Sequence, residues 1–323
     1  MRRSRLYFGL IIVLIVLIIT YTTIGMLDVV SDEELYQVSV IVSNSGSDRW
    51  ITFKEGLDQG AEDNNIKLNI VSTSTFTSIE EQNGVIAREI KNGANGIVLA
   101  SSFSTNVGQT LEKLLSGVAL VLVETDITPN NLYTTIEPNN YEIGDTIAQA
   151  IQEDNHHELS NVKIGVLSGN QNKLSMQQRL LGFQKAMNQS GAQILWEIQD
   201  TGDGMMQILK EKQKNQPVDV LVALDNNEIE ITLDFMEMDK SCKFKVYGEG
   251  CSEKAVYYLD KGYIQALNVP NEFNMGYQSM VVVADLIKNN IARVENRRIE
   301  SLMVNKDNLY DDKNQRLLFP IVQ

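Results

Sequence analysis

The chain has 323 residues, 43% of them hydrophobic and 22% charged, which is an ordinary globular composition and long enough for one large or two medium-sized domains. Its formal net charge is −14, from 42 acidic and 28 basic residues, and no basic stripe stands out that could neutralise a phosphate backbone. Nucleic acid is therefore not expected as a partner. With 2 cysteines, the chain is not a disulfide scaffold.

The first residues of the chain differ in character from the rest. Arg2, Arg3 and Arg5 precede an uncharged, mostly apolar run from Leu6 to Leu27. A helix of this length, at about 1.5 Å per residue, can span a hydrocarbon layer of about 30 Å. Arginines held in the cytoplasm orient the remainder of the chain outward. We therefore predict a transmembrane anchor over residues 1–27 and a single-pass protein of the cell membrane with an extracytoplasmic globular part.

The alternative for this segment is a cleaved secretory signal with its apolar core at residues 6–19. Residues 20–25 offer no good small-x-small cleavage site, which favours retention of the segment. Residues 28–36, with several acidic side chains, are typical of a short stalk between the membrane and the first strand.

From Gln37 onward, short β-branched runs alternate with longer amphipathic stretches, the pattern of βαβ units around parallel sheets. Runs that are apolar throughout, such as Leu120–Val123, indicate sheets covered by helices on both faces. Two sets of about five strands predict two sheets. The strands are expected at 38–42, 67–71, 96–100, 119–123 and 132–136, and then at 163–167, 193–198, 218–223, 244–247 and 264–268.

The predicted helices lie between these strands, and most carry an apolar stripe along one side, such as Phe53, Leu57 and Ala61. The fold class is therefore α/β, with two doubly wound, Rossmann-like lobes that follow one N-terminal transmembrane helix. The helices of the lobes are expected at 49–64, 79–92, 107–115, 141–154, 174–189, 204–214, 227–238 and 272–289.

An ordered set of short motifs resembles the type I periplasmic binding proteins of the ribose-binding type. Residues 40–50, Val-Ile-Val-Ser-Asn-Ser-Gly-Ser-Asp-Arg-Trp, are similar to the opening strand and helix of that family. The resemblance covers about residues 37–304 and rests on the order of the motifs rather than on any one of them. The further landmarks are Gly93–Leu99, Pro138–Asn140 before Gly144, Arg179 before Gly182–Phe183, Asp225, Gly248–Gly250, and Val269–Asn271 before Gly276–Tyr277.

The resemblance implies two lobes joined by three crossings of the chain, near 137–139, near 269–271 and around 290–294, with a ligand held between the lobes. The first lobe then comprises residues 37–138 and 271–292, and the second lobe residues 139–270 and 293–323. The same body occurs in sugar-responsive transcriptional repressors, but those begin with a helix-turn-helix. Here the predicted membrane segment occupies that place.

In doubly wound sheets, ligands bind beyond the carboxyl ends of the strands, where this chain carries many polar residues. Sugar hydroxyls donate and accept hydrogen bonds, so a sugar site needs carboxylates, arginine or amide donors, and a flat aromatic ring. The resemblance and this chemistry together give the predicted ligand contacts, which are Ser47, Arg49, Trp50, Glu124, Thr125, Asn139, Arg179, Asp225, Glu249 and Asn271.

Each of these residues also has a purely structural interpretation. Trp50 is in register with the apolar stripe of its helix and could belong to the core. Arg179 could be a solvated surface charge, and Asp225 or Glu249 could cap the helix that follows. The family places ligand-stacking aromatic residues at the position of Trp50 and commonly at the position before it, where this chain has Arg49.

Enzyme motifs are missing from the sequence, which has no G-x-S-x-G elbow, Walker loop or HExxH. The two histidines, His156 and His157, are adjacent in a polar connection, which is typical of solvated side chains rather than of a metal site. Carboxylates across the cleft could suggest glycoside hydrolysis. Arg179 among them would, however, keep both ionised and leave no evident general acid. We expect neither a metal nor a cofactor.

The sequence thus favours an extracytoplasmic solute-binding protein, not an enzyme, that takes up a small sugar or polyol by hinge closure. It would deliver the ligand to the permease of an ABC importer, or its closed form would be read by a sensor histidine kinase. The alternatives are a carbohydrate-modifying enzyme such as a glycosidase, and the ligand-binding body of a sugar-responsive regulator.

Overall fold

The computed structural model describes residues 7, 12–20, 35–43, 49–130, 132–156, 158–200, 204–240 and 243–319. The chain forms two compact units, Met1–Leu35 and Tyr36–Gln323. In the first unit, residues 12–20 are helical. No helix within the described ranges is both long enough and apolar enough to cross a membrane. Most of the predicted anchor and stalk lies outside the described residues, so both stay predictions.

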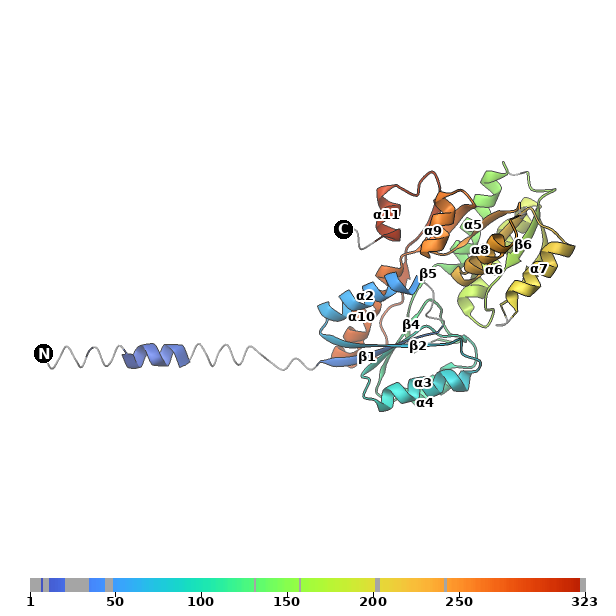
Figure 1. Ribbon diagram of the computed structural model, residues 1–323. Coiled ribbons are helices and arrows are strands. Elements are labelled where there is room, and N and C mark those ends of the chain that lie inside the picture. Colours follow the sequence, from blue (N-terminus) through green and yellow to red (C-terminus); the bar gives the residue numbers. More distant parts are fainter. Residues whose placement is uncertain are drawn as a thin grey trace. The chain divides into compact units, whose positions relative to one another are not determined.

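The first sheet of the second unit has six strands in the order β11-β5-β4-β3-β1-β2 (Figure 1). All neighbouring strands of this sheet are parallel. Because the strands are parallel, their carboxyl ends lie at one edge of the sheet, where a ligand site is expected. The strands are β1 (Tyr36–Ser43), β2 (Ile66–Thr73), β3 (Gly96–Leu99), β4 (Ala119–Val123), β5 (Thr134–Pro138) and β11 (Arg297–Ile299).

Successive residues of the central strands belong to different core clusters, because side chains of a strand alternate between the two faces of a sheet. Val98 and Val121 pack in one cluster with residues of α2 (Arg49–Asp63) and α10 (Glu272–Asn289). Ile97 and Leu120 pack in another with residues of α3 (Ile79–Lys91) and α4 (Gly108–Leu114). Figure 1 shows these two helix pairs on opposite sides of the sheet. The continuous apolar runs of the sequence therefore correspond to a sheet buried on both faces.

The second sheet also has six strands, in the order β12-β10-β9-β8-β6-β7. Its strands are parallel except for β12, which runs antiparallel to β10 at the edge. The strands are β6 (Lys163–Leu167), β7 (Gln193–Ile198), β8 (Val220–Ala223), β9 (Lys245–Glu249), β10 (Ile264–Pro270) and β12 (Ser301–Asn305).

Helices cover both faces of the second sheet as well. One core cluster holds residues of α5 (Asn140–Asp154) and α6 (Leu174–Ser190). The opposite cluster holds residues of the four remaining helices, which are α7 (Met205–Asn215), α8 (Asn226–Met238), α9 (Glu253–Asp260) and α11 (Asp312–Leu318). The second unit thus consists of two α/β lobes, each built on a largely parallel sheet, as the sequence predicts.

Two short strands near the end of the chain were missing from the sequence prediction, and they correct the position of the third crossing. β11 pairs with β5 in the first sheet, and β12 pairs with β10 in the second sheet. The chain therefore changes lobe at Glu300, not around residues 290–294 as predicted. Val294 also bonds to the first lobe, because the Thr134 hydroxyl donates to its carbonyl at 3.0 Å.

In each lobe, the two helices next to the crossings approach so closely that their contact requires glycine. A Cβ atom on Gly276 of α10 would lie 2.2 Å from the backbone oxygen of Phe53 in α2. A Cβ atom on Gly144 of α5 would lie 1.9 Å from the backbone oxygen of Arg179 in α6. Backbone atoms cannot move aside as the end of a side chain can, so these glycines fix the distance between the helices.

Candidate functional site

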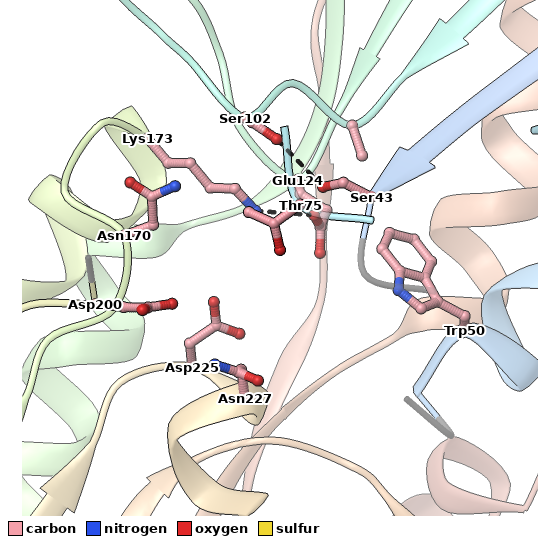
Figure 2. A pocket seen from close by; sticks show the side chains of 11 residues that line it. Ser43, Trp50, Thr75, Ser102, Glu124, Asn170, Lys173, Asp200, Asp225 and Asn227 are labelled. Atoms are coloured by element: carbon pink, nitrogen blue, oxygen red, sulfur yellow. Dashed lines mark hydrogen bonds and ion pairs between the residues drawn. The ribbon is translucent and has the colours of Figure 1, made fainter. Parts of the chain in front are cut away.

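A polar pocket lies between the two lobes, at the carboxyl ends of strands from both sheets (Figure 2). About 620 Å³ of empty space lies among its lining residues, a volume that includes space open to solvent. The first lobe contributes Ser43, Trp50, Thr75, Ala100, Ser102 and Glu124, and the second lobe contributes Asn170, Lys173, Asp200, Asp225 and Asn227.

Trp50 forms part of the first-lobe wall of the pocket. Its ring packs edge-on against Phe53, with ring centroids 5.2 Å apart and an angle of 74° between the planes. The side chain is half-buried and packs against the first-lobe core. The two interpretations of Trp50 are therefore compatible, because one part of the ring contacts the core while another part faces the pocket.

Glu124 enters the pocket from a tight turn directly after β4. Its φ of 67° lies in the left-handed region, which is costly for a residue with a side chain. The turn is closed by the Thr125 amide, which donates to the Val123 carbonyl at 2.8 Å. The Glu124 carboxylate lies 3.9 Å from the Lys173 ammonium group of the second lobe. This ion pair spans the pocket and joins the two lobes (Figure 2).

Thr125 is fully buried and bonds to the second lobe rather than lining the pocket. Its hydroxyl accepts a hydrogen bond from the Ser175 amide at 3.0 Å, and the Ser104 hydroxyl accepts one from the Leu174 amide at 2.8 Å. These amides belong to the first turn of α6, whose own N-cap residue, Lys173, makes no side-chain cap. Two first-lobe hydroxyls therefore cap a second-lobe helix.

The second-lobe wall of the pocket carries two aspartates beside Lys173. Asp200 follows β7, and Asp225 follows β8 at the start of α8, where its side chain makes no helix cap. Glu228 of α8 is 1% exposed and lies near enough to both aspartates for their charges to act on it. Burial and the nearby charges of Asp225 and Asp200 raise the pKa of Glu228 well above its ordinary value.

Arg179 and Glu249 form a buried ion pair inside the second lobe, with 2.8 Å between Nη1 and Oε2. Arg179 also donates to Asn140 Oδ1 at 2.9 Å and to the Leu224 carbonyl at 3.0 Å. Neither member of the pair lines the pocket. Their assignment as ligand contacts stays an untested prediction, and in this structure they neutralise each other.

A model of the periplasmic binding protein domain matches residues 38–291, which is most of the chain. The chain belongs to the type I periplasmic binding proteins. The resemblance inferred from the ordered motifs is thus confirmed for this periplasmic binding protein. The family consists of binding proteins rather than enzymes, in agreement with the interpretation of the sequence. No curated protein gave a significant match to the sequence.

Solved structures with the fold of this periplasmic binding protein share little sequence with it. A carbohydrate transporter solute-binding protein from Agrobacterium radiobacter in complex with D-arabinose is 18% identical, with a TM-score of 0.80 over 89% of this chain and 100% of that chain. An ABC transporter solute-binding protein from Agrobacterium vitis bound with α-D-tagatopyranose is 17% identical, with a TM-score of 0.77 over 88% and 99%. The Caulobacter myo-inositol-binding protein bound to myo-inositol is 16% identical, with a TM-score of 0.74 over 88% and 98%.

Two predicted ligand contacts of this periplasmic binding protein are helix caps at the crossings between the lobes. Asn139 caps α5 by accepting a hydrogen bond from the Glu142 amide, and Asn271 caps α10 by accepting one from the Asn274 amide. Neither lines the pocket. Ser47 lies outside the described residues, as does the side chain of Arg49, which begins α2. The ligand roles of all four stay predictions.

Several pocket residues of this periplasmic binding protein were missing from the sequence prediction. Asn170 and Lys173 follow β6, and Asp200 follows β7. All three lie in segments that follow the carboxyl ends of their strands, as do Glu124 and Asp225, which were predicted. The rule that ligands bind beyond the carboxyl ends of strands could therefore have found them, although they belong to none of the quoted family motifs.

A buried carboxyl group lies beside the first crossing. Glu137 of β5 accepts a hydrogen bond from Arg298 of β11 at 2.8 Å and one from Asn140 of α5 at 3.1 Å. Burial nevertheless raises the pKa of Glu137 to about 7, because it outweighs the opposing effect of Arg298. Through Asn140, this group is connected to Arg179 in the second lobe.

Proposed function

We propose that the protein is an extracytoplasmic solute-binding protein that captures a small sugar or polyol between its lobes. The observation that carries this proposal is the pocket itself, which combines polar side chains from the carboxyl ends of both sheets with the ring of Trp50. Carboxylates such as Glu124 and Asp225 accept hydrogen bonds from hydroxyl groups, Lys173 donates, and an indole ring suits the apolar face of a sugar.

The ligands named for solved structures of the same fold support this class of ligand. They include D-arabinose, α-D-tagatopyranose and myo-inositol, which are small molecules rich in hydroxyl groups. Because these ligands include both sugars and a cyclitol, we propose a class of ligand, the small sugars and polyols, rather than one compound.

Capture by hinge closure follows from where the lining residues come from. Glu124 and Trp50 belong to the first lobe, whereas Asp225 and Lys173 belong to the second, so one ligand reaches both sets only when the lobes lie close together. We expect a decrease in radius of gyration on ligand binding, measured by small-angle scattering. Superimposable curves with and without a tightly bound ligand would contradict capture by closure.

We further propose that residues 1–27 are retained as a membrane anchor and that the binding unit faces outward. The captured ligand is then delivered to an ABC permease, or the closed form is read by a sensor histidine kinase. The full chain should remain with membranes after an alkaline wash. Recovery of a soluble species that begins near Asp28 would show instead that the segment is cleaved.

The decisive experiment is a thermal-shift screen of monosaccharides and polyols. A ligand at 100 times its dissociation constant stabilises the folded protein by about 2.7 kcal/mol, which is readily detected. Recovery of the unchanged ligand after prolonged incubation separates binding from glycoside chemistry. Failure of every sugar and polyol to shift the melting temperature would overturn the proposal.

Replacement of Trp50 tests its contact with the ligand. Trp50→Ala should weaken binding by about 1 to 3 kcal/mol while the protein still folds. Ile51→Ala is the matched control, since Ile51 lies next to it on α2, is 50% exposed and is not part of the pocket lining. Unchanged affinity of Trp50→Ala together with a large loss of melting temperature would assign the ring to the core alone.

A further inference from the structure

Two serines form a hydrogen-bonded pair in the first-lobe wall of the pocket. Ser43 ends β1, Ser102 follows the end of β3, and both line the pocket. Their hydroxyl oxygens lie 3.2 Å apart and share a hydrogen bond, which Figure 2 shows. Ser102 is 1% exposed, whereas Ser43 is half-buried, so the pair is more accessible at Ser43. A hydroxyl has one donor site and two acceptor sites, so such a pair can both donate to and accept from a ligand hydroxyl.

The position of Ser102 is fixed from behind by Gln82 of α3. Gln82 is fully buried, and its Oε1 accepts a hydrogen bond from the Ser102 backbone amide at 2.9 Å. Its Nε2 donates to the Ser101 hydroxyl at 3.2 Å, and that hydroxyl donates to the Phe103 carbonyl at 2.7 Å. A single side chain of α3 therefore binds the segment that carries Ser102 at two neighbouring residues.

The place of Gln82 on α3 is a core position. The buried residues of this helix are Gln82, Ile86 and Glu89, which recur at the spacing of one helix face. An amide buried on such a face is costly unless its hydrogen bonds are made. Those of Gln82 are made to the segment after β3, so the glutamine at this position is tied to the conformation of that segment.

Glu89 shows what a purely structural buried polar residue looks like on the same face. It accepts hydrogen bonds from Ser39 of β1 at 3.1 Å and from Asn69 of β2 at 2.8 Å. Neither partner lines the pocket. Gln82 differs from Glu89 because its partner, Ser102, does line the pocket.

We propose that Gln82 is a positioning residue of the ligand site. It holds Ser102 where the hydroxyl of that residue orients Ser43, and the serine pair binds one hydroxyl group of the ligand. Gln82 itself does not line the pocket. The inference rests on the proposed function, because it takes this pocket as the ligand site.

The test is calorimetry on the full chain with D-arabinose, D-tagatose, D-galactose and myo-inositol as probes. Gln82→Met keeps the length of the side chain but removes both of its hydrogen bonds. It should weaken the tightest-binding probe about tenfold, which is the effect of about one hydrogen bond. Gln82→Glu keeps an acceptor for the Ser102 amide and should retain most of the affinity.

Two comparisons separate positioning from a general loss of stability. Glu89→Met removes buried hydrogen bonds from the same helix face and should lower the melting temperature without changing affinity. In a Ser102→Ala background, Gln82→Met should weaken binding much less than in the wild type, because Gln82 acts through the Ser102 hydroxyl. If Gln82→Met does not fold, Gln82→Asn, whose shorter amide cannot reach the Ser102 backbone, should show the same loss of affinity.

The inference and the proposed function fail in different ways. If Gln82→Met or Gln82→Asn folds and binds as tightly as the wild type, or if the effects of Gln82→Met and Ser102→Ala simply add, Gln82 has only a structural role. The positioning role is then refuted, and the solute-binding function stands. If none of the probes binds the wild type, the proposed function fails and this inference fails with it.

Discussion

The cap that the first lobe supplies to α6 offers a direct way to disturb the contact between the lobes. The Thr125 hydroxyl accepts the hydrogen bond of the Ser175 amide, and the Ser104 hydroxyl accepts that of the Leu174 amide. Thr125→Val preserves the shape of the side chain but removes the acceptor. Ser104→Ala removes the second acceptor and also frees the Asp126 carbonyl to which Ser104 donates.

The size of the effect follows from measured helix caps. Loss of one cap typically costs about 1 kcal/mol, so the double variant should lose about 2 kcal/mol. This loss of stabilisation affects only the form in which the lobes touch. Once the lobes separate, water can bind the two amides in place of the hydroxyls. The ratio of closed to open protein should then fall by about 30-fold, and the apparent dissociation constant of the ligand should rise by a similar factor.

The assay is calorimetric affinity together with small-angle scattering of the free and bound protein. Ser78→Ala is the matched control, because the Ser78 hydroxyl caps α3 by accepting from Glu81 within the first lobe. It should lower the free energy of unfolding by about 1 kcal/mol and leave affinity unchanged. The reasoning is refuted if the double variant binds as tightly as the wild type, or if Ser78→Ala weakens binding equally.

Three further changes probe the interior. Gly144→Ala should lower the free energy of unfolding by about 1 to 3 kcal/mol in urea titrations, whereas Gly84→Ala, where a Cβ atom meets nothing within 4 Å, should raise it by about 0.5 to 1 kcal/mol. Glu137, whose pKa rises from 4.5 to about 7 on folding, stays protonated in the folded protein after the unfolded chain has ionised. Stability should therefore fall by about 3 kcal/mol as the pH rises through this interval, and Glu137→Gln should flatten the decline. Arg179→Ala leaves Glu249 buried without its cation and should cost about 3 to 5 kcal/mol, so a melting temperature equal to that of the wild type would contradict the buried pair.

Much of the architecture could be predicted from the sequence because its signals are local. Runs such as Leu120–Val123 indicate buried parallel strands, and every predicted strand overlaps an observed one. β11 was missed because Arg297, Arg298 and Ile299 offer no apolar pattern, and its strand character comes from pairing with β5. Pairing between distant segments is a tertiary property that no short window contains.

The same distinction between local and tertiary properties applies to the residues of the site. Trp50, Glu124 and Asp225, which the resemblance and the ends-of-strands rule single out in the sequence, line the pocket, and their contact with a ligand stays a prediction. The position of Arg179 on α6 does not reveal that its side chain turns inward to Glu249. Asn139, three residues before Glu142, fits a helix-capping pattern that the sequence does contain.

The three crossings of the chain also determine when each lobe can finish folding during synthesis. The apolar face of the first sheet around Val98 and Val121 is covered partly by Val282 and Val283 of α10, which leave the ribosome only after residues 139–270. At a synthesis rate of about 5 to 20 residues per second, that face of the sheet stays uncovered for roughly ten seconds or more before α10 can pack on it. The second lobe is completed later still, by β12 and α11. Neither lobe can act as an early folding unit, so both must be kept from aggregating until almost the whole chain has been made.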